Sequence, residues 1–394
     1  MRRSSSGNGA DPMERRVIVK SFVSEPPRYS RSQVEAFEWL AAAHALAAST
    51  RTGRAERSGA LRERIMDLLL RYSCAPEHIG SRRSDIPDFM HTDWQRMTIF
   101  NLQESPRGRG LGIRNAFYAG TADRVVEALF SRDTQPPSDL IHVSCTGYVS
   151  PSPIQRLIER KGWNRSTRAV QVYHMGCYAA LPALRIAAAL TECGGARAEI
   201  VHTELCTLHF NPADHSPVQL IIQTLFADGH IRYAVVHDEA RNRADGAFEI
   251  VALQEEVVPD SLDDMTWTVS EWGFEMTLSR DVPGKIADAL PRFLVELFSK
   301  AGMKYSDEGE GAVFAIHPGG PRILDSVQEL LGLKEIQLRL SRMILFERGN
   351  MSSATLPHIW MAAAADASVK PGSIIVSLAF GPGLTIAGAI FRKC

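Results

Sequence analysis

The run from Val170 to Leu190 constrains the fold more than any other stretch of this chain. It begins as an apolar, β-rich strand, turns at Met175 and Gly176, carries Cys177 alone, and continues as a helix too apolar to be exposed. Backbone N–H groups at the start of a helix favour an anion, so we expect the Cys177 thiol to be partly or largely ionised near neutral pH. The run predicts a strand that delivers a nucleophile to a buried helix, and the alternative is an inert core cysteine.

Composition excludes several classes of protein. With 394 residues, 45% of them hydrophobic and 23% charged, the chain can form one large core or two fused halves, and it fits no fibrous, disordered or membrane class. Its net charge of −1 gives no long-range attraction for nucleic acid or an anionic membrane, and no stretch has the length of a membrane span. We therefore expect neither nucleic acid nor a membrane as a partner.

The N-terminal residues and the cysteines indicate the compartment. The first residues lack the apolar segment of a signal peptide, and residues 1–14 are expected to form a disordered tail. The six scattered cysteines include no C-x-x-C pair and no short spacing to histidine, so no metal site is predicted. Reduced thiols of this kind are typical of a cytoplasmic protein.

The order of the elements predicts repeated β-α-β units. Strands are expected at residues 16–23, 139–144, 198–202, 231–236, 313–317, 373–380 and 381–390, and helices at 35–44, 58–73, 121–130, 154–161, 322–331 and 353–365. Residues 107–114 are expected to form a loop, because their glycines do not follow G-x-G-x-x-G, and residues 241–246 a charged turn. Arg82 and Arg83 are placed in a polar loop, where such a pair is usually solvated but can also hold phosphate groups.

A weak internal repeat divides the chain into halves at residues 15–245 and 246–394. Strand, turn and helix occur at 139–161 and again at 312–331, and each is followed by a strand, a polar residue and a helix, at Cys177 and at Asn350. A duplicated α/β unit brings Cys177, His317 and Asn350 to the mouths of equivalent strands, where such sheets place their sites.

Cysteine, histidine and asparagine in this order are compatible with two chemistries. In a thiol peptidase the histidine holds the cysteine as thiolate and the asparagine orients the histidine. However, a papain-like cysteine lies near the mature N-terminus in C-G-[SA]-C-[WY], whereas Cys177 lies mid-chain in HMGCY. The alternative is a condensing enzyme, in which the thiolate takes an acyl group and the other two side chains stabilise an enolate oxygen.

Several motifs together indicate a family. They are YHMGCYAA around Cys177, TLFADG around Phe226, RDVPGKI around 281–284, AIHPGGPRILD around His317, ERGNMSSAT around Asn350, and FGPGLT at 381–385. From about residue 17 onward, the chain resembles the type III polyketide synthases, the chalcone and stilbene synthase family, and is similar to bacterial-type members. The resemblance implies a homodimer with an α/β, thiolase-like fold of five layers, αβαβα. Residues 15–245 then carry the cysteine, and residues 246–394 the histidine and asparagine.

The same resemblance implies catalytic roles for three residues. Cys177 takes the starter acyl group of an acyl-CoA as a thioester. His317 keeps the thiol ionised and, with the Asn350 amide, donates hydrogen bonds to the thioester oxygen of malonyl-CoA, so that loss of CO2 leaves a stabilised enolate. The enolate carbon attacks the Cys177 thioester, and the extended chain closes to a pyrone or a phenolic, resorcinol-type product. Coenzyme A thioesters serve as substrates, and no metal or redox cofactor is expected.

The resemblance also indicates which residues line the substrate cavity. Phe226 matches an aromatic residue that guards the junction of the pantetheine tunnel and the cavity, whereas Met276 replaces a second aromatic residue of the plant enzymes. Cys145 and His209 stand where small hydroxyl residues line the plant cavity, and Ser150 stands where a methionine precedes the proline that reaches into the partner subunit. These departures favour a fatty or other aliphatic starter. Further substrate-binding residues are predicted to be Arg82, Arg83, Gly319, Gly320, Gly381 and Pro382.

Two other functions remain open from the sequence. One is a ketoacyl synthase III type enzyme, which performs a single condensation with a starter from coenzyme A or an acyl carrier protein. The other is a non-catalytic or hydrolytic relative of the same fold, although the intact Cys, His and Asn argue against it. The motifs HPGGPRILD and FGPGLT favour the polyketide synthase.

Overall fold

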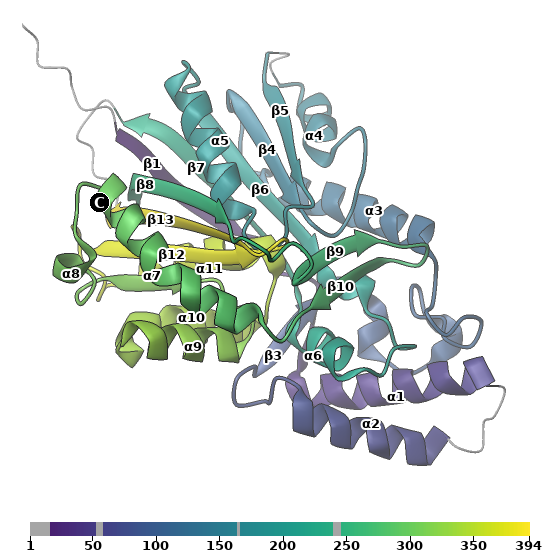
Figure 1. Cartoon of the computed structure of the whole chain (residues 1–394). Helices are drawn as coiled ribbons and strands as arrows, with labels where there is room; N and C mark the ends of the chain where they lie inside the picture. The colour runs from purple at the N-terminus through teal and green to yellow at the C-terminus, as the bar shows by residue number, and fades with distance from the viewer. Residues whose placement is uncertain (1–15, 53–57, 164–165, 239–245) are drawn as a thin grey trace, which may run out of the picture.

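A nine-stranded mixed sheet forms the centre of the computed structural model, which describes residues 16–52, 58–163, 166–238 and 246–394 (Figure 1). Its strands follow the order β11-β12-β13-β8-β1-β7-β6-β4-β5. In chain order they are β1 (Arg16–Ser24), β4 (Asp139–Ser144), β5 (Arg168–Tyr173), β6 (Arg197–Leu205), β7 (Asp228–Asp238), β8 (Phe248–Val257), β11 (Val313–Ile316), β12 (Ile374–Gly381) and β13 (Thr385–Lys393).

Two short ribbons and a set of helices surround this sheet. The ribbons are β2 (Tyr29–Ser32) with β3 (Ser81–Ser84), and β9 (Met265–Val269) with β10 (Phe274–Leu278). The helices are α1 (Gln33–Thr52), α2 (Ser58–Tyr72), α3 (Leu111–Leu129), α4 (Pro153–Lys161), α5 (Ala180–Glu192), α6 (Pro217–Leu225), α7 (Val282–Lys300), α8 (Tyr305–Glu308), α9 (Pro321–Leu331), α10 (Glu335–Arg348) and α11 (Thr355–Ala365). In the described part of the chain, none of them has both the length and the apolar character needed to span a membrane.

The helices form three layers around two halves of the sheet. Helices α5 and α11 pack in one cluster with strands of both halves, for example Leu184 and Trp360 with Ile200 of β6 and Ile375 of β12. On the outer faces, α3 and α4 pack against β4 and β6, and α7 and α9 pack against β11, β12 and β13. The order is helix, strand, helix, strand, helix, which confirms the predicted thiolase-like αβαβα fold.

The two halves share one sheet, and the predicted repeat is only partly correct. Strand β1 joins the halves, because it pairs with β7 on one side and with β8 on the other. A strand is predicted before Asn350, but residues Leu345 to Arg348 are the last turn of α10. Leu345 packs in the same cluster as α7 and α9, so this apolar residue belongs to a helix face.

Two local predictions are wrong, and two others cannot be examined. Arg82 and Arg83 lie in strand β3 and not in a loop. Helix α3 begins at Leu111, inside the predicted loop at 107–114, because the Arg114 side chain is buried and hydrogen-bonds to backbone carbonyls that precede the helix. The predicted tail at 1–14 and most of the predicted turn at 241–246 lie outside the described residues.

Candidate active site

The turn that carries Cys177 joins β5 to α5 and packs on the loop at 381–385. Gly176 has φ of +80°, and a side chain there would collide with Pro382, so this position requires glycine. A side chain at Gly381 would collide with the Tyr178 ring. Gly381, predicted to bind substrate, therefore forms a packing surface for the nucleophile turn.

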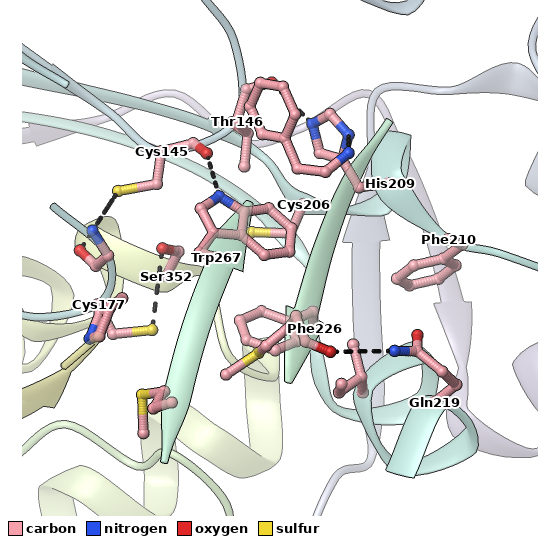
Figure 2. A pocket seen from close by; sticks show the side chains of 16 residues that line it. Cys145, Thr146, Cys177, Cys206, His209, Phe210, Gln219, Phe226, Trp267 and Ser352 are labelled. Atoms are coloured by element: carbon pink, nitrogen blue, oxygen red, sulfur yellow. Dashed lines mark hydrogen bonds between the residues drawn. The ribbon is translucent and has the colours of Figure 1, made fainter. Parts of the chain in front are cut away.

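Cys177 faces a cavity of about 580 Å³, open mouth included (Figure 2). Its walls are formed by Cys145, Thr146, Gly176, Cys177, Cys206, His209, Phe210, Gln219, Ile222, Phe226, Met265, Trp267, Phe274, Met276, Ser352 and Pro382. The structure thus brings six predicted residues to one cavity: Cys145, Cys177, His209, Phe226, Met276 and Pro382. No Asp, Glu, Lys or Arg of the described chain is among the lining residues, so the cavity suits an uncharged, largely apolar group.

Two neighbouring side chains contact Cys177 and its turn. The Cys177 sulfur lies 3.9 Å from the hydroxyl oxygen of Ser352. The Cys145 sulfur accepts a hydrogen bond from the Gly176 N–H at 2.9 Å and donates one to the Gly176 carbonyl at 3.3 Å. Burial raises the pKa of Cys145 well above its usual value, so it remains a thiol and positions the turn.

The Cys177 thiol is protonated near neutral pH, whereas the sequence predicts that it is partly or largely ionised. Burial raises the pKa of this thiol to about 12, whereas the helix N-terminus is expected to lower it. Hydrogen bonds from Ser352 and Asn350 favour the thiolate, but the Glu204 carboxylate raises the pKa further. The expectation fails because removal of the sulfur from water has a larger effect than the nearby N–H groups.

His317 follows β11 and is 1% exposed. Its backbone N–H donates to the Leu378 carbonyl of β12 at 2.8 Å. Burial lowers the pKa of the imidazole to about 3, so the resting ring is neutral. Both ring nitrogens are buried. Neither has a hydrogen-bond partner among the described residues, Cys177 included. The predicted role of His317 in catalysis therefore stays a prediction.

Asn350 is held between α6 and β7 by its backbone. Its N–H donates to the Leu225 carbonyl at 2.9 Å, and its carbonyl accepts from the Ala227 N–H at 2.8 Å. The Ser352 N–H donates to the Asn350 side-chain oxygen at 2.8 Å, and this contact defines which end of the amide is oxygen. The amide NH2 is consequently free to act as a donor, and the Asn350 side chain hydrogen-bonds to the Cys177 thiol.

We expect Ser352→Gly to retain decarboxylation of malonyl-CoA and Ser352→Val to lose most of it. Ser352 has φ of +50°, which glycine adopts readily and a β-branched residue does not. Strain of this kind costs about 1–3 kcal/mol. A valine can relieve it only by a change of the backbone, which moves the N–H that orients Asn350. Release of CO2 by the two variants measures the effect. An equal loss in the two variants, which both lack the hydroxyl, would show that the hydroxyl and not the backbone is the important group.

His209 lines the cavity with its ring, but its nitrogens are not available to a substrate. Its Nδ1 accepts from the Phe274 N–H at 3.0 Å, so its Nε2 carries the proton and donates to the Thr146 carbonyl at 2.9 Å. The ring also stacks on Phe274, with centroids 4.3 Å apart. Burial lowers its pKa to about 3. His209 is therefore a neutral wall residue that fixes the position of the β9–β10 ribbon.

Phe226 and Met276 both line the cavity. Phe226 ends α6, where its carbonyl accepts from the Arg82 guanidinium at 2.7 Å. Met276 belongs to β10, and its carbonyl accepts from the Gln219 side chain at 3.1 Å. Hydrogen bonds to backbone thus fix both residues, and their side chains remain free to shape the cavity.

Five of the predicted substrate-binding residues do not line this cavity: Gly381, described above, and Arg82, Arg83, Gly319 and Gly320. The Arg82 guanidinium is buried and bonded to Gln33 and to backbone carbonyls, so it does not hold a phosphate group of a substrate in this cavity. Arg83 donates to the Pro27 carbonyl at 3.2 Å. Gly319 and Gly320 form the turn between β11 and α9, next to His317. Arg82 does not reach this cavity because its guanidinium is buried against Gln33 and backbone carbonyls.

The β9–β10 ribbon is not predicted from the sequence, and of the residues that it contributes to the cavity only Met276 is predicted. This ribbon provides Met265, Trp267, Phe274 and Met276 to the cavity, and Trp267 donates to the Cys145 carbonyl at 2.7 Å. The alternation in MTWTV and FEMTL, on either side of Gly273, is a hairpin signal that could have located it. Ser352, Cys206 and Gln219 carried no comparable signal. Among the described residues, no group of three or more His, Cys, Asp or Glu could hold a metal ion.

The fold and the site together define a thiolase-fold condensing enzyme. Residues 122–238 match the N-terminal domain of the chalcone and stilbene synthases, and residues 249–394 match their C-terminal domain. The chain therefore belongs to the chalcone and stilbene synthase family and is a type III polyketide synthase, a condensing acyltransferase. This result does not favour the ketoacyl synthase III alternative.

Solved structures share the fold over almost the whole chain. PKS-I from the brown alga Ectocarpus siliculosus is 24% identical, with a TM-score of 0.83 and coverage of 98% of this chain and 100% of that chain. The C-terminal type III polyketide synthase domain of Steely1 from Dictyostelium is 22% identical, with a TM-score of 0.79 and coverage of 96% and 99%. The 1,3,6,8-tetrahydroxynaphthalene synthase from Streptomyces coelicolor A3(2) is 23% identical, with a TM-score of 0.76 and coverage of 95% and 99%.

Proposed function

We propose that this chain loads an aliphatic acyl-CoA on Cys177 and extends it by decarboxylative condensation with malonyl-CoA. The observation that carries the proposal is the arrangement of Cys177, Asn350 and Ser352, in which an oriented amide contacts a thiol that faces an apolar cavity. In the loading step the sulfur attacks the acyl carbon, coenzyme A leaves, and the thiol proton passes to the neutral ring of His317. The proton transfer creates a thiolate and an imidazolium together, whose attraction opposes the cost of burial.

Extension follows from the same donors. Malonyl-CoA loses its carboxylate as CO2, and the electron pair of the broken C–C bond enters the thioester as an enolate. The Asn350 NH2 and the protonated His317 donate to the enolate oxygen. The enolate carbon then attacks the Cys177 thioester, so that a C–C bond forms, the C–S bond breaks and the thiolate returns. The extended chain is now a thioester of coenzyme A, and the Cys177 sulfur takes it back with release of coenzyme A before the next extension. Repetition and ring closure give the proposed pyrone or resorcinol-type product.

We expect His317→Ala to move the pH dependence of Cys177 alkylation to higher pH. Burial is the largest of the effects that raise the pKa of the thiol to about 12. The proposed proton transfer to His317 opposes burial, so loss of the ring leaves less thiolate at any pH below that value. The rate of inactivation by iodoacetamide, measured against pH for parent and variant, tests this. Superimposable profiles would exclude His317 as the partner of the thiol.

An aliphatic starter is supported by the side chains around the sulfur. The cavity walls include Met265, Met276, Ile222 and Cys206, and both ring nitrogens of His209 are occupied. Apolar and sulfur-containing walls match an alkyl chain better than a phenol, whose hydroxyl needs a hydrogen-bond partner.

Met276→Phe is expected to shift starter preference toward shorter chains. The flexible methionine of the parent can change rotamer to make room for an extended chain. A rigid phenylalanine ring at the same wall cannot. The shift should be graded, because one methylene in an apolar pocket is worth only about 1–3 kcal/mol. The kcat/KM values for a chain-length series of acyl-CoA starters measure it, with Phe226 unchanged in both proteins. Equal profiles for variant and parent would remove Met276 from the route of the starter.

The assembly and the location of the enzyme also belong to the proposal. The segment with Ser150 and Pro151 is exposed, which supports a homodimer in which it reaches the partner subunit. We also propose that the enzyme acts in the cytoplasm, as the sequence predicts.

Product masses test the proposed reaction. The purified protein is incubated with a series of aliphatic and aromatic acyl-CoA starters, or with the corresponding acyl carrier protein thioesters, and labelled malonyl-CoA. We expect aliphatic CoA starters extended by more than one two-carbon unit. A single extension would support the ketoacyl synthase alternative, and preference for an aromatic starter would contradict the proposed starter class.

A further inference from the structure

A second cavity, of about 400 Å³ with its open mouth, lies beside the β2–β3 ribbon. It is lined by Tyr29, Ser30, Arg31, Ala36, Leu40, Arg82, Arg83, Ser84, Phe89, Met90, Thr207 and Phe210. The ribbon and α1 form two of its sides, and six of the twelve lining residues are aromatic or aliphatic. Phe210 lines both this cavity and the reaction cavity, so the two are neighbours.

Two arginines face each other across the ribbon at this cavity. Arg31 of β2 is the register partner of Arg82 of β3, and register partners project from the same face of a ribbon. Like charges in this position destabilise a ribbon. Arg82 is only 7% exposed, so water screens its charge little. An anion bound beside the pair would therefore be stabilised by both positive charges.

The protein itself does not supply that anion to Arg82. The guanidinium donates to the Gln33 side-chain oxygen at 2.8 Å and to the carbonyls of Gln223 at 2.9 Å and Phe226 at 2.7 Å, which are all neutral. No ion pair joins Arg82 or Arg31 to a carboxylate in the described chain. The positive charge of the pair is thus not neutralised by direct contact.

Arg31 has an unused donor, and the nearest carboxylates are engaged elsewhere. Its Nε is buried without a hydrogen-bond partner among the described residues. The Glu35 carboxylate accepts from the Ser32 N–H at 2.9 Å and from the Ser32 hydroxyl at 2.7 Å. The Asp228 carboxylate accepts from the Thr207 N–H at 2.9 Å. A ligand oxygen at Arg31 would satisfy a donor that the described chain leaves unpaired.

We propose that this cavity binds an amphiphile with an oxyanion head, a carboxylate or a phosphate, on an apolar body. The planar fork of Arg31 matches two oxygens of such a head. Leu40, Phe89 and Phe210 provide the apolar wall for the body. Because Phe210 also forms part of the reaction cavity, the occupant contacts the wall of the site in which the chain grows.

Calorimetric titration of the full chain with octanoate, octyl phosphate, octan-1-ol and inorganic phosphate tests the proposal. We expect octanoate or octyl phosphate to bind at least about tenfold more tightly than octan-1-ol, since hydrogen bonds to charged groups are the stronger ones. Inorganic phosphate should bind more weakly than octyl phosphate, because it lacks the apolar body. The comparison of octanoate with octyl phosphate identifies the preferred head, and equal affinity for octan-1-ol would overturn the proposal.

Variants of the ribbon and of α1 locate the bound ligand. Arg31→Met should weaken binding of the preferred anion by about tenfold or more, and Ala36→Leu should weaken it by filling the cavity without changing its charge. Arg160→Met is the matched control, because Arg160 of α4 is a surface arginine that does not line this cavity. Met276→Phe controls for binding in the reaction cavity. Unchanged affinity in both Arg31→Met and Ala36→Leu, or loss of binding in Met276→Phe alone, would overturn the assignment.

Discussion

Replacement of Cys177 by alanine is expected to abolish covalent acyl loading and to leave the fold intact. The substitution removes one sulfur atom, whose hydrogen bond to Ser352 is long at 3.9 Å, so little packing is lost. The required positive φ belongs to Gly176 and not to Cys177, so the backbone of the turn is unaffected. Without the sulfur there is no nucleophile in the turn, and loading should fall below detection. Intact-protein mass spectrometry after exposure to an acyl-CoA, together with the thermal unfolding midpoint, measures both effects.

Two other cysteines provide controls for this result. Cys193 is exposed, and Cys206 lines the same cavity. Cys193→Ala and Cys206→Ala should both retain one acyl group per chain. Appearance of an acyl mass on the Cys177→Ala protein would show that another residue is the nucleophile.

Asn350→Ala is expected to reduce decarboxylation of malonyl-CoA by about 10²–10³-fold and to affect acyl loading much less. Loss of one donor to a developing oxyanion typically has an effect of this size. The Asn350 backbone, which holds the site to Leu225 and Ala227, is retained in the variant. CO2 release and acyl loading are measured on the same preparation, so that loading serves as the internal control. Equal losses in the two steps would contradict the assignment of Asn350 to the malonyl oxygen.

The elements that were predicted correctly are those whose signals lie within one short stretch of the sequence. The run around Cys177 contains its own strand, turn and helix, and residues 139–144, with apolar Leu140, Ile141 and Val143, form the fully buried strand β4. Both were located correctly for this reason. The region before Asn350 was not, because LFERGN has too few residues to distinguish the end of a helix from a strand.

The parts of the site that could not be predicted depend on contacts between distant residues. The role of Arg82 is set by Gln33 and Gln223, which are 49 and 141 positions away. The orientation of the His209 ring is set by the Phe274 N–H, 65 positions away. The pKa of Cys177 depends on how much water the closed cavity admits, which no local motif records.

The mass of the peptide that carries Cys177 shows most directly whether the acyl chain is loaded and extended on this residue. The protein is mixed briefly with an aliphatic acyl-CoA and malonyl-CoA, quenched in acid, digested and analysed by mass spectrometry. The account predicts that the Cys177 peptide carries the starter and, in addition, the starter extended by successive two-carbon units. Extended chains found on Cys145 or Cys206 in place of Cys177, or a Cys177 peptide that never carries more than the starter, would contradict it.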